Sequence, residues 1–298
     1  MKKKALILGI ETSCDETAAA VLEESAKTIP NLLSNIVSSQ EEIHKKFGGV
    51  VPELAARSHI DKIDLIVNEA LNKSGKKLTD IDAIAVTSGP GLIVCLSVGL
   101  NFAKALAMTL KKPLIVVNHL EGHALSPKLI TDLKYPYLLL LISGGHSQYL
   151  AVKKLGKYKR LGTTIDDAVG EAFDKTAKLL GIKFPGGPYI EKFAAKGNKD
   201  RFDLPKPIIN KGGCNLSFAG LKTAVLKISK SIKNNQDKHD LAASFQKTIE
   251  EILVKKTKIA FDQFKKMHQS PEHEQFHGQL GAFMAAPPQR NFYHVVAE

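Results

Sequence analysis

Short apolar runs and longer amphipathic stretches alternate along the 298 residues of this chain. Apolar runs beside small or turn-forming residues predict β-strands at residues 6–12, 18–22, 81–87, 114–118, 138–142 and 148–152. Apolar positions spaced three or four residues apart predict helices over 53–71, 92–110, 165–181 and 241–264. This alternation favours an α/β fold in which helices pack on a mixed sheet.

The order of apolar strand, small polar turn and returning strand occurs twice, at residues 6–22 and 138–152. Two such hairpins predict two lobes of similar fold with a ligand cleft between them, because turn N–H groups are suited to holding phosphates. The alternative is an ordinary α/β protein that contains two unrelated hairpins. We expect the lobes at residues 1–125 and 126–264, followed by a divergent and poorly ordered tail at 265–298.

The net charge is +12, and residues 151–298 hold 26 basic and 15 acidic side chains, so they carry +11 of it. A basic second half favours a polyanionic partner such as nucleic acid, because phosphate neutralisation releases counterions. Lysines that only solubilise the surface would produce the same composition.

Cysteine usage and the start of the chain bear on its location in the cell. Three isolated cysteines encode no disulfide framework, which is typical of a reducing compartment. The apolar run after the first lysines is only six residues long, which is too short for a signal peptide. We therefore expect a cytoplasmic protein without a membrane span.

The segment NHLEGH at residues 118–123 is the most specific local motif. His119 and His123 follow a predicted strand and share one face of a helix, where both imidazoles can bind one metal ion. The zinc-protease helix signature differs, because it has Glu directly after the first His, whereas Glu121 comes two positions later. The alternative is one packed and one solvated histidine without a common ligand.

Glycine-rich turns and acidic residues mark further candidate positions. The turns SGGH at 143–146, SGPG at 88–91 and PGGP at 185–188 let the backbone approach a phosphate, base or sugar, although each is also explained as a plain turn. Asp167, Glu171 and Asp174 line one face of the predicted helix 165–181, and Asp174 is suited to bind a ribose diol. Glu11, Asp15 and Glu16 cluster in the first turn, either as solvated acids or as groups at a cation or a proton transfer.

Eight motifs together resemble the TsaD family, the tRNA adenosine threonylcarbamoyltransferases, whose archaeal and eukaryotic relatives belong to the KEOPS complex. The motifs cover residues 4–264 in the family's order: IETSCDET at 10–17, FGGVVPELAAR at 47–57, GPGL at 89–92, HLEGH at 119–123, SGGH at 143–146, IDDAVGEAFDKTAK at 165–178, PGGP at 185–188 and SFAGLK at 217–222.

The resemblance implies an actin-like (ASKHA) fold of two RNase-H-like lobes. It also implies that the threonylcarbamoyl group passes from threonylcarbamoyl-AMP to N6 of the adenosine beside the anticodon of tRNA. The partners it implies are proteins of the TsaB and TsaE types, with residues 53–71 as the docking helix. The implied cofactor is one divalent metal ion, iron (Fe2+) or zinc, acting as a Lewis acid.

The same resemblance assigns roles to individual residues. His119 and His123 would bind the metal, and Asp15 and Glu16 would be catalytic acids near the reacting centre. The adenylate would be held by Leu141, Ile142, Ser143, Gly144, Gly145, Asp174, Gly187 and Glu191.

The chain departs from the family after residue 264. The family's glycine-rich turn with a nucleoside-binding Asn, and its third metal ligand, an Asp, have no counterpart, because no Asp follows Asp262. We interpret this as a truncated or frame-shifted end that leaves the second lobe incomplete; an alternative is that a ligand comes from His268, His273, Glu274 or His277. The functional alternatives are an impaired remnant that keeps partner binding, an actin-fold small-molecule kinase and a metalloprotease.

Overall fold

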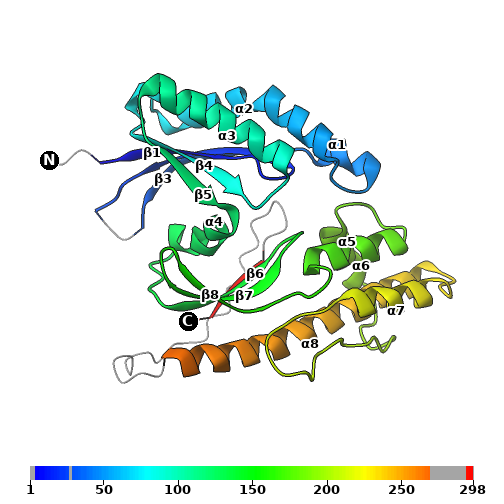
Figure 1. Cartoon of the computed structure of the whole chain (residues 1–298). Helices are drawn as coiled ribbons and strands as arrows, with labels where there is room; N and C mark the ends of the chain where they lie inside the picture. The colour runs from blue at the N-terminus through cyan, green and yellow to red at the C-terminus, as the bar shows by residue number, and fades with distance from the viewer. Residues whose placement is uncertain (1–3, 27–28, 269–292, 298) are drawn as a thin grey trace. The chain divides into compact units, whose positions relative to one another are not determined.

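The computed structural model describes residues 4–26, 29–268 and 293–297. The chain divides into two compact units, Met1–Leu133 and Lys134–Glu298, each with its own sheet, helices and apolar core (Figure 1). The division lies a few residues beyond the position 125/126 expected from the sequence, because a short 3-10 turn at Ser126–Leu129 still belongs to the first unit.

The first unit is built on a five-stranded sheet of order β3-β2-β1-β4-β5. Its strands are β1 (Leu6–Glu11), β2 (Glu16–Glu23), β3 (Asn31–Ser39), β4 (Ala83–Gly89) and β5 (Leu114–Asn118). The first three strands pair antiparallel, whereas β4 is parallel to β1 and β5 is parallel to β4. This order is that of an RNase-H-like lobe, as the resemblance implied.

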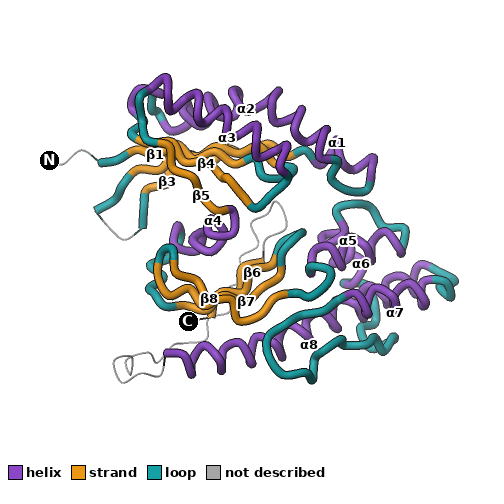
Figure 2. The backbone as a smooth tube through the Cα atoms, in the orientation of Figure 1, coloured by secondary structure: helices purple, strands orange, loops and turns teal. Residues whose placement is uncertain are grey.

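Helices cover one face of this sheet (Figure 2). The helices on this face are α2 (Pro52–Ser74) and α3 (Ile93–Leu110); α1 (Glu41–His44) precedes α2 in the chain, and α4 (His119–Leu125) follows β5 on the other side. α2 packs on β2 and β3, while α3 packs on β4 and on α2. Alternate residues of β1 are buried under them: Leu6, Leu8 and Ile10.

α3 buries a stripe of small residues, namely Cys95, Gly99, Ala103 and Ala107. Its length and composition alone would let it cross a membrane, which the sequence analysis did not anticipate. A Cβ added at Gly99 would lie 2.3 Å from the Thr12 hydroxyl, so this helix sits directly against the turn after β1. Its buried stripe is therefore the packing surface of a core helix.

The second unit holds a four-stranded sheet of order β8-β7-β6-β9. Its strands are β6 (Tyr137–Ile142), β7 (Ser147–Lys154), β8 (Lys157–Thr163) and β9 (Tyr293–Ala297). All neighbours are antiparallel, so β9 runs antiparallel to β6, whereas the corresponding neighbour in the first unit runs parallel. The poorly ordered tail expected from the sequence falls mainly on residues 269–292 and 298, which lie outside the described residues.

Four helices complete the second unit: α5 (Val169–Leu179), α6 (Gly186–Ala194), α7 (Ala219–Ser229) and α8 (Asn235–His268). The core between them and the sheet contains large buried side chains such as Tyr149, Phe218 and Phe245. α6 packs on both α5 and α8, which fixes the start of α6 beside α5.

Two sequence predictions in this unit are wrong in detail. The helix predicted from residue 165 begins only at Val169, and Ile165 is 61% exposed instead of joining the apolar stripe. The Asp166 carboxylate explains the late start, because it accepts hydrogen bonds from Phe218 N (2.7 Å) and Ala219 N (3.3 Å) at the start of α7. The PGGP segment opens α6 with Pro185 as its N-cap residue, so it is not a flat turn.

Candidate functional site

The histidine pair lies where a strand passes directly into a helix. Asn118, the last residue of β5, accepts hydrogen bonds from Leu120 N (2.9 Å) and Glu121 N (3.3 Å) and thereby caps α4. α4 therefore begins at His119, as the sequence predicted, and His123 follows one turn later. The two Nε2 atoms are 3.0 Å apart, and the ring planes are nearly perpendicular at 83°.

This geometry fits a bound metal ion. Two imidazole nitrogens that are each about 2.1 Å from one ion lie roughly 3.0–3.4 Å apart in tetrahedral or octahedral coordination. The Nε2 separation of His119 and His123 agrees with that range. Within the described ranges, no third His, Cys, Asp or Glu joins the pair to form a three-ligand cluster.

A half-buried carboxylate orients the first of these imidazoles. Glu11 Oε2 lies 3.4 Å from His119 Nδ1, and the Glu11 carboxylate also accepts hydrogen bonds from Ser13 N and the Thr87 hydroxyl. Burial by itself raises the pKa of Glu11, but the hydrogen bonds from His119, Ser13 and Thr87 outweigh it and bring the pKa to about 2. An ionised Glu11 that accepts the Nδ1 proton leaves Nε2 of His119 as the lone-pair donor.

In the sequence, Glu11 stands out only as one acid of a cluster with Asp15 and Glu16. Its partner His119 is 108 positions away, so no local pattern connects the two. The structure also shows Ser13 Oγ at 3.2 Å from His119 Nδ1. The turn between β1 and β2 therefore reaches the histidine pair, and the same turn carries Asp15 and Glu16, both half-buried.

In the second unit, the turn between β6 and β7 has the form of an anion-binding loop. Leu141 and Ile142 are buried strand residues that end at this turn, so only their backbone leads into it. The Ser143 hydroxyl accepts the His146 N–H (3.0 Å), while Gly144 and Gly145 are exposed. In the described part of the chain, no partner takes the N–H groups of these two glycines.

α5 connects this turn to the predicted nucleoside contacts. A Cβ added at Gly170 would lie 2.8 Å from Gly144 Cα, so the start of α5 lies against the turn. Asp174 follows one helical turn later, and its Oδ1 accepts the Gly186 N–H at 2.6 Å. Gly187 is therefore adjacent to Asp174, whereas Glu191 lies further along α6 and is exposed.

The other acids near α5 have structural partners. Asp167 precedes the helix, so it shares no helical face with Asp174, and it pairs with Lys175 (2.6 Å) and Lys222 (3.5 Å). Glu171 pairs with Lys175 at 2.6 Å. These lysines compensate the charges of Asp167 and Glu171.

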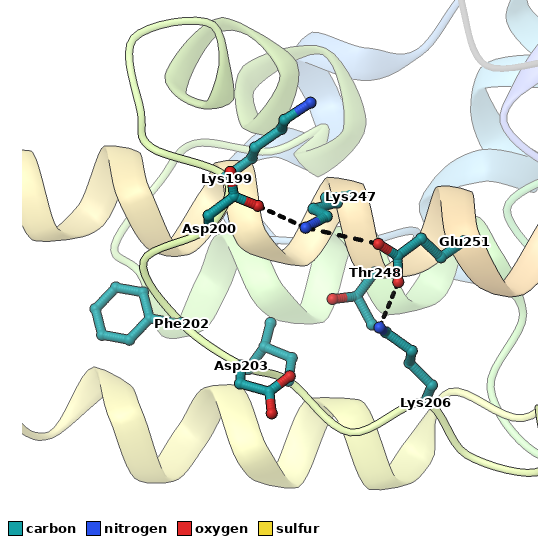
Figure 3. Close-up of a pocket in the computed structure, with 9 residues that line it drawn as sticks. Lys199, Asp200, Phe202, Asp203, Lys206, Lys247, Thr248 and Glu251 are labelled. Carbon is teal, nitrogen blue, oxygen red and sulfur yellow. Dashed lines mark hydrogen bonds and ion pairs between the residues drawn. The ribbon is translucent and has the colours of Figure 1, made fainter.

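A further hollow among the described residues is lined by charges that pair with one another. The hollow in Figure 3 lies between residues 199–206 and α8, where Lys247 pairs with Asp200 (2.5 Å) and Glu251 (3.6 Å) and Lys206 pairs with Glu251. These charges compensate one another and attach the loop to the helix. His268 stacks on Phe264 at the end of α8, and the other tail candidates, His273, Glu274 and His277, lie outside the described residues.

Comparisons with known proteins identify the family of the chain. A model of the family described as "TsaD: tRNA N6-adenosine threonylcarbamoyltransferase" matches residues 31–275. The chain belongs to the TsaD family. A TsaD relative from Pelagibacter ubique, named tRNA N6-adenosine threonylcarbamoyltransferase, is 72% identical over 268 residues, which are 90% of this chain and 75% of the relative. A relative of the same name from Rhizobium johnstonii is 53% identical over 261 residues, which are 87% of this chain and 72% of the relative.

Two solved structures illustrate the distant likenesses of this TsaD chain. YeaZ from Pseudomonas aeruginosa matches with a TM-score of 0.36 and 17% identity over 52% of this chain and 63% of YeaZ. Component A of (R)-2-hydroxyglutaryl-CoA dehydratase from Acidaminococcus fermentans matches with a TM-score of 0.43 and 12% identity over 92% of this chain and 93% of that one.

Proposed function

We propose that the chain transfers the threonylcarbamoyl group of threonylcarbamoyl-AMP to N6 of the adenosine beside the anticodon of tRNA. The observation that carries this proposal is the 72% identity to a named threonylcarbamoyltransferase over 90% of the chain. Each unit supports it by itself: the first offers two imidazoles, and the second offers a glycine turn and an acid suited to a ribose.

The second unit would bind the adenylate. The N–H groups of Gly144 and Gly145, which have no partner in the described part of the chain, would donate to its phosphate. The Asp174 carboxylate would accept hydrogen bonds from the ribose, with Gly187 alongside. Leu141, Ile142 and Ser143 hold the turn in place, and Glu191 is a peripheral contact.

The first unit would hold the metal and the reacting end. TsaD proteins are metal-dependent, and His119 and His123 are the residues that would hold the ion, iron (Fe2+) or zinc. When bound, the ion supplies Lewis-acid stabilisation to the carbamoyl and phosphate oxygens. Asp15 and Glu16 would accept the proton that N6 loses as its bond to the carbamoyl carbon forms and the bond to AMP breaks.

The direct test is a reconstituted transfer reaction. Purified protein, threonylcarbamoyl-AMP and unmodified tRNA are incubated with TsaB- and TsaE-type proteins, and nucleosides are analysed by mass spectrometry. We expect threonylcarbamoyladenosine in the wild type and none in the double variant His119→Ala, His123→Ala. ATP turnover with a small alcohol and without tRNA, in a separate assay, would instead favour a kinase.

The proposed protein partner is a TsaB-type protein that docks on α2. Two large apolar side chains of this helix, Ile60 and Leu65, are each 62% exposed and would be available to such a partner. The TsaE-type partner and the cytoplasmic location follow from the family alone.

The alternative is a catalytically impaired protein that retains partner binding. The observation that favours it is the antiparallel pairing of β9 with β6, where the first unit has a parallel neighbour of β1. Grafting the C-terminal segment of the Pelagibacter relative after residue 264 distinguishes the two proposals. A gain from no product to product would support the impaired protein, and equal rates would support the intact enzyme.

A further inference from the structure

Four polar side chains form a buried hydrogen-bonded chain beside the candidate site of the first unit. Thr17, His44 and His59 are 0% exposed and Gln40 is 1% exposed. They come from β2, the segment before α1, α1 itself and α2. Burying polar side chains in an apolar core costs free energy unless each donor and acceptor is hydrogen-bonded. The hydrogen-bond partners of this cluster therefore indicate its role.

The chain of hydrogen bonds has one consistent direction. Val51 N donates to His44 Nδ1 (3.2 Å), so His44 Nε2 carries its proton and donates to Gln40 Oε1 (3.1 Å). Gln40 Nε2 donates to His59 Nδ1 (3.2 Å), which also accepts the Thr17 hydroxyl proton (2.8 Å). The tautomer of His59 is thereby settled, with its proton on Nε2.

His59 ends this chain on the backbone of the β1–β2 turn. Its Nε2 donates to the Cys14 carbonyl at 3.0 Å. The carbonyls on either side are held by backbone groups, Ser13 O by Leu92 N (2.8 Å) and Asp15 O by Gln40 N (3.1 Å). Of these three consecutive carbonyl groups, that of Cys14 is therefore the one that a side chain holds by a hydrogen bond.

The peptide group that joins Cys14 to Asp15 lies in the middle of the proposed catalytic turn. Ser13, before it, contacts His119, and Asp15 and Glu16 follow it. A rotation of the Cys14–Asp15 peptide would redirect the Asp15 carboxylate, whereas Glu16 already belongs to β2, where it pairs with Ser39 of β3. The side chain that prevents this rotation is His59.

We propose that His59 is a positioning residue, whose Nε2–H holds the Cys14 carbonyl and so sets the direction of the neighbouring catalytic acid, Asp15. Gln40 and Thr17 keep the imidazole in the tautomer that can donate. The expected effect of His59 on the reaction rate rests on the proposed function. Its expected effect on the structure of the turn can be measured without an activity assay.

The test compares two variants of the full chain. In His59→Gln the amide nitrogen reaches the same carbonyl, whereas His59→Phe keeps the ring volume and removes the donor. We expect His59→Phe to lower kcat about 10- to 100-fold, as misplaced catalytic groups do, with KM for tRNA and metal content unchanged. His59→Gln should restore most of the rate.

The matched control is His239→Phe, because His239 Nδ1 also bonds a backbone carbonyl, that of Phe193 (3.0 Å), but in the second unit. It should leave kcat unchanged. Hydrogen exchange of the peptide covering residues 12–17 provides the readout independent of activity. It should rise in His59→Phe and stay at the wild-type level in His59→Gln and His239→Phe.

Equal exchange in wild type and His59→Phe would overturn the inference, as would equal kcat losses in His59→Phe and His59→Gln. A wild type that forms no product would contradict the proposed function, while the exchange comparison would still decide the role of His59. Should His59→Phe fail to fold, Thr17→Val removes one donor to Nδ1 and should lower kcat about fivefold, the equivalent of one hydrogen bond.

Discussion

Glu11 illustrates how a single carboxylate prepares a metal-binding imidazole. It is held by Ser13 N and the Thr87 hydroxyl, so its position does not depend on His119 alone. Its pKa of about 2 means that it stays ionised under all ordinary conditions. A fixed anion at Nδ1 makes Nε2 of His119 the more basic nitrogen and sets the ring orientation.

We therefore expect Glu11→Gln to weaken metal binding by about 10- to 100-fold, the usual effect of losing such a partner. The measurement is a Co2+ titration followed by visible absorbance. The control is Glu69→Gln, because Glu69 is an exposed acid on α2. A dissociation constant equal to that of the wild type would show that Glu11 does not support the site.

Gly170 allows the second unit to bring α5 against the glycine turn. An added Cβ would lie 2.8 Å from Gly144 Cα and 2.9 Å from Ser143 O, and neither backbone atom can yield as a flexible side chain would. Gly170→Ala should reduce the free energy of unfolding by about 1–3 kcal/mol, as overpacking does, and weaken binding of AMP as probe.

Denaturant unfolding and AMP titration measure the two effects. Gly212→Ala is the matched control, because a Cβ at this exposed glycine meets no atom within 4 Å. If both variants bind AMP equally well, the turn does not contact the phosphate.

At the level of elements, the β7–β8 hairpin is the most strongly charged segment of the second unit. Residues 153–160 read KKLGKYKR and contain no acid. Lys154 and Lys157 face each other directly across the two strands, an arrangement that repels. Throughout the described ranges, no ion pair compensates the cations of this hairpin, so tRNA phosphates are suitable partners.

Replacing Lys154, Lys157 and Lys159 by Gln should weaken tRNA binding and lower its salt dependence by about 0.7–0.9 per lost phosphate contact. Fluorescence anisotropy at several salt concentrations measures both quantities. The control replaces the exposed lysines Lys227, Lys230 and Lys233, on or just after α7. An equal loss in the control would mean that overall charge, and not this hairpin, attracts tRNA.

For the whole molecule, the decisive feature is that each unit has a core made of its own residues. The first unit contains its complete sheet of five strands and also both histidines. We expect residues 1–133 to fold alone with a cooperative thermal transition and to bind one Co2+. Circular dichroism and the cobalt titration check this, and an unfolded fragment would show that the first unit depends on the second.

Much of the fold was predictable because helix and strand periodicity are local. The strand at Leu114–Asn118 and the helix ending at Leu110 agree with the pattern of apolar residues. β8 and α7 were missed, because β8 is a charged edge strand and α7 starts on a cap supplied by Asp166 from far along the chain. Local patterns carry no information about such distant partners.

The sequence by itself determined which residues recur at helical and strand spacing. It thereby placed His119 and His123 on one helical face and marked the glycine turn at residues 143–146. Only the tertiary structure decided that Glu11 orients His119, that Gly170 abuts Gly144 and that His59 holds the Cys14 carbonyl. The physical reason is that backbone periodicity is set by neighbours along the chain. Hydrogen-bond partners in a core are set by the packing of sheets and helices, which joins residues that are far apart in sequence.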